Sequence, residues 1–543
     1  MKFTKLALAC ALGLAGIHQA SADVEIHIVG STAFRAATVN SIINRLGSPV
    51  GIYTDDGSSI SGSNNCVITG TYTGVTGNVI VRCAWSGSVA GIQAVTGGAN
   101  IKFLVGGNNS GGTAVTASAV TVSGSVASGG GAIHTVTSQT AAIQPEITMA
   151  DNYQSSTLYT SPHLGNDNIV GIIPFALVSS QNAPADVTNI GPNAMKAMWT
   201  SGGYLSAEVL SGNTADHASF GGTDGTLMYA IGRDNGSGTR VNCFAESGIG
   251  IQTAVFQFTP NATITGVAIT NNTVTDITLD TRGLNGSTVN AGFGGESSGG
   301  SLADVTRYNT LLGNSGAGVT DDANSNSPRP VAFITYLGES DSYRATAGNG
   351  SGVTGTNAGN AHYLTYNGVG AFGGIFFNDV VSTTSGNTTL SAAGSTSPST
   401  AFVGVVAGQY LRGANIAADA VVVSVNTGAN PNTLVMSIAA TGTSTTAKAT
   451  VNNLLPTPFR LGTYTFWGYE HIMWGTFVTD TFGTAADKST VANAVKTQIA
   501  TGGYQSGVVN ASNKGDYYAA GLANDSAMTV GRSSDGGGVV AKY

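Results

Sequence analysis

Arg233-Asp234-Asn235-Gly236-Ser237-Gly238-Thr239 is the most informative local sequence of this chain, and it leads into a helix-compatible segment, Arg240–Glu246. A Gly-Ser-Gly-Thr turn before a helix directs unpaired backbone N–H groups and two hydroxyls toward one point, where the helix dipole adds partial positive charge. Arg233 can add charge-assisted hydrogen bonds. The stretch therefore predicts a pocket for an anion, although in a chain with 77 glycines it is also consistent with an ordinary helix cap.

Two other turns have the same character. Gly30-Ser31-Thr32-Ala33 lies between the strand-like Val24–Val29 and a predicted helix, and Ser86-Gly87-Ser88 lies between the strand Asn78–Arg82 and the helix candidate Gly91–Val95. Turns of this kind meet at the carboxyl ends of the strands in an α/β sheet, where ligands bind. We expect the three turns to converge on one ligand, although each taken singly is better explained as a helix cap.

Helices and short apolar runs alternate along much of the chain. Four helices are predicted: one contains Val39–Leu46, one begins at Pro192, one follows Ser237, and one is capped by Ser489 or Thr490 and runs through Ile499. The short apolar runs include Ile169–Val178 and Val331–Leu337. Because short apolar runs that alternate with helices are typical of strands buried on both faces, the fold class is predicted to be α/β.

Three stretches interrupt this alternation, at about 51–78, 100–145 and 372–452, and a shorter one lies near 251–290. All are rich in Thr, Ser, Val, Gly and Asn and have the spacing of short antiparallel strands. We interpret them as β-rich insertions on an α/β scaffold. For the part richest in Gly and Ser, near 105–130, disorder is the alternative, since little there could bury apolar area.

Composition excludes several classes of protein. The chain has 543 residues, enough for two to four domains, and a formal net charge of −8 with only 9% charged residues. No run of Lys or Arg could follow a phosphate backbone, which argues against nucleic-acid binding. The histidines are scattered, so neither a zinc site nor any cofactor is predicted. A serine or cysteine nucleophile beside a base is also missing, and no enzymatic activity is predicted.

The N-terminus resembles an export signal. Lys2 and Lys5 precede an apolar run, and Ala20-Ser21-Ala22 resembles a cleavage site, so residues 1–22 are predicted to be a signal peptide cleaved near Ala22. No later stretch approaches the ~20 apolar residues that span a bilayer. The mature protein is therefore expected to be periplasmic or secreted.

The mature chain would contain three cysteines. Cys66 and Cys83 flank a turn-punctuated, alternating segment, as two strands of a hairpin would, and export is an oxidising context. We predict that these two form a disulfide. Cys243 has no evident partner and is predicted to be a small buried residue on a helix rather than a reactive thiol.

Taken together, four motifs resemble those of the periplasmic phosphate-binding proteins, which are solute-binding proteins of ABC transporters. They are Gly30-Ser31-Thr32, Ser86-Gly87-Ser88, Ala150-Asp151 and Arg233 through Thr239, and Val170–Val178 is similar to the family's crossing strand. The resemblance implies a two-lobed, type II periplasmic-binding-protein fold with β-rich insertions. The first lobe would span 23–172 and 459–543, and the second lobe 173–458.

The resemblance also implies a ligand set. Thr32, the Ala33 N–H and Ser88 would bind from the first lobe, and Arg233, Ser237, Gly238 and Thr239 from the second. Asp151 would set specificity, because an ionised carboxylate only accepts hydrogen bonds and so favours an oxyanion that still carries a proton. The alternative for Asp151 is a helix cap or turn residue.

The implied function is that of an exported protein that binds a small oxyanion, phosphate, in the cleft between the lobes and presents it to an ABC permease or a sensor. A different class of function is also consistent with the sequence. In that alternative the scaffold is retained, and the β-rich insertions make the chain an extracellular surface-interaction protein.

Overall fold

The computed structural model describes residues 23–541, except for the following positions: 56–62, 106–129, 137–138, 181–182, 219–224, 264–272, 284–290, 309–319, 322–330, 339–340, 343–344, 347–360, 371–374, 396, 404, 406, 408, 414, 417–419, 453–457, 459–460, 501–527 and 537. The predicted signal peptide at 1–22 and most of the stretch near 105–130 therefore lie outside the described residues.

A large mixed sheet organises the described chain, which has a mixed α/β architecture. Its strand order is β5-β2-β3-β4-β1-β6-β22-β7-β14-β10-β9. The bounds of these strands are β5 Gly130–Thr135, β2 Gly47–Thr54, β3 Asn65–Thr71, β4 Asn78–Ala84, β1 Val24–Gly30, β6 Ile147–Ala150, β22 Trp467–Trp474, β7 Asn166–Ser179, β14 Val331–Gly338, β10 Leu227–Ala230 and β9 Tyr204–Ser206. The short strands β15 (His362–Tyr366) and β8 (Asn189–Ile190) extend the sheet from β7.

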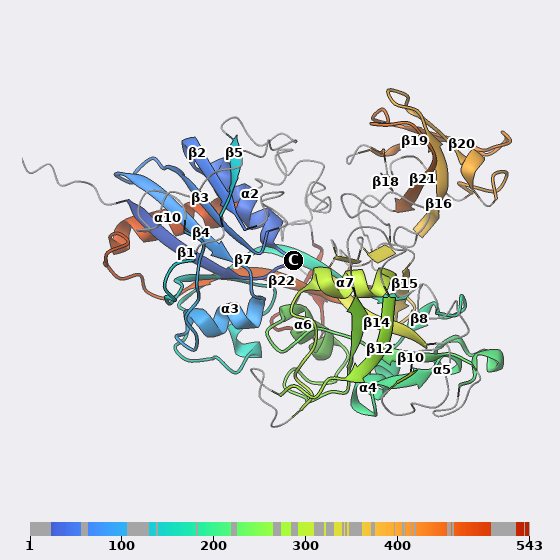
Figure 1. Ribbon diagram of the computed structural model, residues 1–543, viewed down its shortest axis with the longest axis horizontal. Coiled ribbons are helices and arrows are strands. Elements are labelled where there is room, and N and C mark those ends of the chain that lie inside the picture. The colour runs from blue at the N-terminus through green and yellow to red at the C-terminus, as the bar shows by residue number, and fades with distance from the viewer. Residues whose placement is uncertain are drawn as a thin grey trace, which may run out of the picture.

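Helices lie against both halves of this sheet. In Figure 1, α2 (Arg35–Arg45), α3 (Ser88–Val95) and α10 (Ala485–Ala500) lie with β1 to β4. These strands and β6, which pairs with β1, are called the first half. The helices α4 (Pro192–Thr200), α5 (Glu208–Ser211), α6 (Gly238–Glu246) and α7 (Gly299–Tyr308) lie with β10 and β14, the second half.

The first residues of the helices test the helix starts that were predicted from the sequence. The helix α4 begins at Pro192, and α6 follows Ser237, whose hydroxyl accepts the Arg240 N–H at 3.3 Å, both as predicted. The expected cap of α10 at Ser489 or Thr490 is wrong. That helix begins one turn earlier, where the Thr484 hydroxyl accepts the Asp487 N–H at 3.1 Å.

One long strand, β7, is shared by the two halves. Its residues from Asn166 to Pro174 pair with β22, and Pro174 lies opposite Trp467. From Phe175 onward it pairs with β14 instead, with Phe175 opposite Gly338. The change of partner therefore occurs between two adjacent residues, and both halves are built on one continuous backbone.

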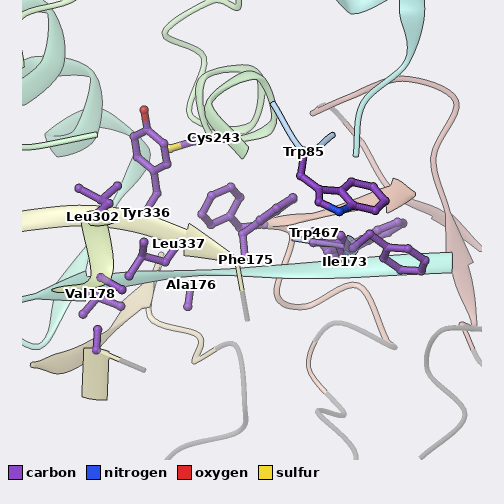
Figure 2. Packing of buried hydrophobic residues seen from close by; sticks show 14 of the residues in the cluster. Trp85, Ile173, Phe175, Ala176, Val178, Cys243, Leu302, Tyr336, Leu337 and Trp467 are labelled. Atoms are coloured by element: carbon purple, nitrogen blue, oxygen red, sulfur yellow. The ribbon is translucent and has the colours of Figure 1, made fainter. Parts of the chain in front are cut away.

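The apolar core follows this shared strand. Figure 2 shows Ile173, Phe175 and Val178 along β7, with Trp467 of β22 beside them. Cys243 of α6 lies next to Tyr336 of β14 in the same view and is 1% exposed. Burial raises the pKa of the Cys243 thiol well above its ordinary value, so the prediction of a buried, unreactive residue is confirmed.

The described residues of the stretch 51–78 belong to the main sheet instead of standing outside it as a surface insertion. They supply part of β2 and all of β3, and β3 pairs antiparallel with both β2 and β4. Alternating Thr and Val residues specify strands, but they do not specify which sheet the strands join. The insertion predicted at about 51–78 is thus corrected to a segment within the main sheet, next to its edge strand β5.

The predicted disulfide is also corrected. Cys66 of β3 and Cys83 of β4 lie directly opposite each other in the antiparallel register, as a hairpin pairing requires. Both are nevertheless free, buried thiols in the structure. Burial, followed by the neighbouring Cys66, raises the pKa of Cys83 well above its ordinary value, which makes the thiol the favoured form in this apolar site.

Residues 375–452 form a separate six-stranded antiparallel unit, which we call the β module. Its strands are β16 Ile375–Thr383, β17 Thr389–Ser391, β18 Tyr410–Gly413, β19 Val422–Asn426, β20 Thr433–Met436 and β21 Ser444–Asn452. It has its own apolar cluster, which includes Val381, Leu390 and Leu434. Figure 1 shows the module in orange, apart from the main sheet. Its first and last residues, Ile375 and Asn452, are strand partners.

A second small sheet occupies part of the stretch near 251–290. It consists of β11 (Phe258–Thr263), β12 (Thr273–Leu279) and β13 (Thr320–Asp321). The last strands, β23 (Val530–Gly531) and β24 (Val540–Ala541), form a short hairpin.

A buried charge network joins α10 to β1. His27 contacts Glu25 through Nε2 and Glu146 through Nδ1, both at 2.9 Å. Arg82 forms a two-point ion pair with Glu25 at 2.8 and 2.9 Å, and Lys488 of α10 donates to Glu146 at 2.9 Å. Burial lowers the pKa of His27, but the two carboxylates outweigh it and the net change is upward.

Candidate functional site

Asp151 is the centre of the candidate site. It directly follows β6 and is 2% exposed. The Ser88 hydroxyl, at the start of α3, donates to its Oδ1 in a very short contact, and the Asp151 N–H donates to Ser88 Oγ at 3.2 Å. The Thr239 hydroxyl, in the first turn of α6, donates to Oδ2 at 3.4 Å. One carboxylate thus gathers hydroxyls from both halves of the sheet.

The start of α6 approaches Asp151 very closely. A side chain at Gly238 would overlap Oδ1 of Asp151 and would reach Oδ1 of Asn152 at 2.7 Å, so the position requires glycine. The side-chain amide of Asn242, one turn along α6, donates to the carbonyl oxygens of Asp151 at 2.5 Å and Gly238 at 3.1 Å. Ser237 caps this helix, as described above.

Burial decides the protonation of Asp151. It raises the pKa of this carboxyl to about 6, against the opposing effects of its backbone hydrogen bond, of Arg233 and of Thr239. The carboxyl is therefore mostly ionised at neutral pH and becomes protonated in mild acid. In its ionised form it can only accept hydrogen bonds, as specificity for a proton-bearing ligand requires.

Arg233 is buried near this cluster but is held by another segment. Its Nε donates to the Glu296 carbonyl and its Nη2 to the Ser297 carbonyl, both at 3.0 Å. These carbonyls directly precede α7, and a side chain at Gly299 would come within 3.4 Å of Arg233 Nη1. The guanidinium therefore lies at the start of α7, and its charge acts on Asp151.

Thr32 lies in a polar hollow of about 210 Å³ between the two halves. Thr32 and Arg35 line it from the start of α2, Ser298, Gly300 and Ser301 from the start of α7, and Asp341 completes that side. Ala33 approaches the end of β14, where a side chain at Gly338 would contact it at 3.4 Å. Two helix N-termini thus open onto one hollow.

The two halves also touch through backbone groups. The N–H groups of Val89 and Ala90, in the first turn of α3, donate to the Gly236 carbonyl at 3.0 and 3.2 Å. A second hollow of about 250 Å³ lies beside this contact and is lined by residues that include Ser86, Asn235 and Arg282.

The predicted site residues therefore fall into two groups. Ser88, Gly238 and Thr239 all approach Asp151, and Ser237 is the cap of the same helix. Thr32 lines the hollow, Ala33 lies at the end of β14, and Arg233 lies at the start of α7. Sequence reasoning missed Asn242, which lies one helical turn after Gly238.

Sequence reasoning also missed Glu470. It lies in β22, a strand that also contains Trp467, Tyr469 and Trp474. Glu470 is the one acid in a strand whose residues are all buried, and this single acid could have identified it as a candidate site residue.

The C-terminal hairpin contributes a further buried acid beside the site. Asp535 accepts the Tyr153 N–H at 2.8 Å, and burial raises its pKa to about 6. Arg532 of the same segment donates to the Thr465 carbonyl at 2.6 Å and lies 4.1 Å from the centre of the Trp467 ring. The end of the described chain thus packs against β22 and the residues after β6.

Within the described ranges, no three His, Cys, Asp or Glu side chains are grouped so that they could hold a metal ion. None of the helices in the described part of the chain combines the length and apolar character that a membrane crossing needs.

No protein-family model and no curated protein sequence matches the chain. Solved structures do match, with low scores. A protein from Clostridium perfringens described as a phosphate ABC transporter substrate-binding protein, with bound phosphate, has a TM-score of 0.27 at 14% identity, over 64% of this chain and 76% of that one.

Two further structures are similar at the same level. An ABC-type phosphate transport receptor from Vibrio cholerae has a TM-score of 0.25 at 12% identity and covers 63% of this chain and 77% of its own. A protein from Planctomyces limnophilus described as a phosphate binding protein has a TM-score of 0.24 at 11% identity, over 64% and 71%. These TM-scores are too low to carry an argument about function.

Proposed function

We propose that this chain is an exported solute-binding protein that holds a small, proton-bearing oxyanion, phosphate, between the two halves of its sheet, for uptake through a permease or for sensing. The observation that carries the proposal is the placement of the buried Asp151 carboxylate at the N-terminus of α6. Hydroxyls from both halves converge on it there, and the guanidinium of Arg233 lies within electrostatic reach.

The chemistry of these groups matches hydrogen phosphate. The hydroxyls of Ser88 and Thr239 and the first N–H groups of α6 are donors, which suit the unprotonated oxygens of an oxyanion. The ionised Asp151 is an acceptor, which suits the one oxygen that carries a proton. Sulfate at neutral pH has no proton to offer and would face the carboxylate with like charge. The site therefore supports selection of phosphate over sulfate.

Entry of the anion requires the two halves to separate. Asp151 and Ser88 belong to the first half and Gly238 and Thr239 to the second, so rotation about β7 and β22 would open the cluster to solvent. Binding would then exchange the hydroxyl contacts on Asp151 for contacts to the anion and close the halves over it.

Isothermal titration of the purified chain, beginning at Asp23, with phosphate and with sulfate tests this function. We expect one phosphate per chain and an affinity at least about tenfold higher than for sulfate, equivalent to about 1.4 kcal/mol. Absence of phosphate binding at neutral pH would contradict the proposal.

The β module supports a second candidate function, attachment to an extracellular surface. It has an apolar core of its own, and Val403, Val423 and Ile438 are large apolar side chains that it leaves substantially exposed. Comparing the full chain with a chain that lacks residues 372–452 for attachment to cells, glycans and matrix tests this candidate. It fails if the two attach equally.

A further inference from the structure

Glu470 is a buried acid that the site as proposed above does not use. It lies in the middle of β22 and is 0% exposed. Among the described residues, neither of its carboxyl oxygens has a hydrogen-bond partner of acceptable geometry. Buried carboxyl groups normally have such partners, because the loss of water without a compensating hydrogen bond destabilises the fold. An unpartnered one therefore calls for an explanation.

The register of the sheet places Glu470 beside Asp151. His471 of β22 pairs with Ala150, the last residue of β6, in an antiparallel arrangement. The preceding residue on β22 therefore lies next to the residue that follows β6. Its other neighbour, on β7, is Gly171, which has no side chain to occupy the adjacent space.

Side-chain alternation shows which way Glu470 points. Gly468 and Glu470 are two residues apart on a regular part of β22, so they share one face of the sheet. A side chain at Gly468 would lie 2.7 Å from Oδ1 of Asn242 and 3.0 Å from the Asp151 carbonyl. The shared face is therefore the one covered by α6, the helix whose N-terminus forms the candidate site.

Charge then determines the form of Glu470. Burial raises its pKa well above the ordinary value, and the neighbouring Asp151 raises it further, whereas the Ser31 hydroxyl acts in the opposite direction. Two ionised carboxylates cannot share such a site without strong repulsion, so the proton stays on Glu470. A neutral carboxylic acid differs from a carboxylate in having an O–H donor.

We propose that Glu470 is a further ligand-binding residue, which as a neutral acid donates a hydrogen bond to the anion held at the N-terminus of α6. This inference rests on the proposed function and deepens it. Asp151 would accept the proton of the bound phosphate, and Glu470 would donate to one of its unprotonated oxygens. The two carboxyl groups would thus have opposite roles, set by their surroundings.

Other buried acceptors at the same place agree with this assignment. Oδ1 of Asn152 and Oδ1 of Asn242 also have no partner within the described part of the chain. Hydrogen phosphate brings one proton, which Asp151 would accept, and an ionised Glu470 would add one more acceptor and a second negative charge. A neutral Glu470 keeps Asp151 as the single acid of this cluster that carries charge.

Two variants separate a ligand-binding role from a structural one. Glu470→Gln keeps the size and a neutral donor, and Glu470→Leu removes both donor and acceptor. Because neither oxygen of the acid has a hydrogen-bond partner of acceptable geometry among the described residues, Glu470→Leu should unfold at the same temperature as the wild type or higher without phosphate. In titrations with inorganic phosphate it should lose at least about tenfold in affinity, and Glu470→Gln should stay within about threefold of the wild type.

A spectroscopic measurement tests the protonation without any ligand. The infrared band of a protonated carboxyl should be present in the wild type at neutral pH and absent from Glu470→Gln. Equal phosphate affinity of the wild type and Glu470→Leu, or no such band difference, would overturn this inference alone. Absence of phosphate binding by the wild type would overturn the proposed function and this inference together.

Discussion

The Ser88 hydroxyl donates a hydrogen bond to Oδ1 of Asp151, a residue 63 positions later in the chain. The two lie after different strands of the first half, β4 and β6, which flank β1 in the sheet. A serine at a helix start and a carboxylate after a strand therefore meet because parallel strands deliver their carboxyl ends to the same edge. The consequences of this meeting point can be tested one residue at a time.

Asp151→Asn replaces the acceptor with an amide of nearly equal size. We expect phosphate affinity to fall by at least about tenfold and the preference over sulfate to shrink, because the amide can donate to an oxygen that has no proton. Titrations with both anions provide the measurement, and Asp186→Asn, at an exposed carboxylate, is the matched control. Unchanged selectivity in Asp151→Asn would exclude this residue as the discriminating group.

Gly238→Ala places a methyl group where Oδ1 of Asp151 now lies. Either the carboxylate or α6 must move, and we expect a loss of stability of about 1–3 kcal/mol together with loss of most phosphate binding. Gly165→Ala is the control, since nothing lies within 4 Å of a side chain there. Denaturant unfolding and titration measure the two effects, and wild-type affinity in Gly238→Ala would contradict the site geometry.

Arg233→Ala removes both a positive charge near Asp151 and the hydrogen bonds to the carbonyls before α7. We predict roughly 10- to 100-fold weaker phosphate binding and a lower unfolding temperature, because hydrogen bonds to charged groups contribute about 1.5–3 kcal/mol. The control is Arg282→Ala, whose guanidinium pairs with Asp280. If both variants bind phosphate equally well, Arg233 is a structural residue only.

Deleting residues 372–452 and joining the ends with a short Gly-Ser linker should leave phosphate affinity within about threefold of the full chain. The reason is that the β module has its own core and that Ile375 and Asn452 are strand partners, so the chain leaves and returns at one place. Titration of the shortened chain checks this. A large loss of affinity would show that the module belongs to the binding site.

His27 predicts a dependence of stability on pH. Its pKa in the folded protein is above the ordinary value of 6.5, so the folded state binds the proton more strongly than the unfolded state. The stabilisation is complete below about pH 6.5 and is lost as pH rises through the folded pKa. Urea unfolding from about pH 5 to about pH 9 should show this decline in the wild type and a flatter profile in His27→Gln. His217→Gln, at an exposed histidine, should keep the wild-type slope.

Residues typical of helix starts predicted the beginnings of helices in the second half well. Pro192 and Ser237 act through their own backbone geometry and hydrogen bonds, which are written in a few adjacent residues. The sheet that a strand joins does not depend on adjacent residues alone. The stretch at about 51–78 was predicted as an insertion. Its strands pair with their neighbours in sequence, but they join the main sheet through the parallel pairing of β4 with β1, which no local pattern states.

The site shows the same division. Hydroxyls and glycines at strand-to-helix turns were visible in the sequence, and Ser88, Asp151 and Thr239 meet in the structure. The partners of Arg233 were not visible, since backbone carbonyls leave no mark in a sequence. Glu470 was missed because its importance comes from what surrounds it, and burial without a partner is known only once the strands are assembled.

The change of pairing partner in β7 falls at Pro174, a residue without an amide hydrogen. A strand that passes from one set of neighbours to another must tolerate a change of backbone torsion where its partners change. Pro174 has no N–H group that could lose a hydrogen bond there. Its ring fixes φ, and the N–H of the next residue, Phe175, donates to the Phe466 carbonyl at 3.1 Å, so the backbone at this point has little conformational freedom. The two halves therefore share a strand whose course, at the residue where its partners change, is fixed by a single imino acid.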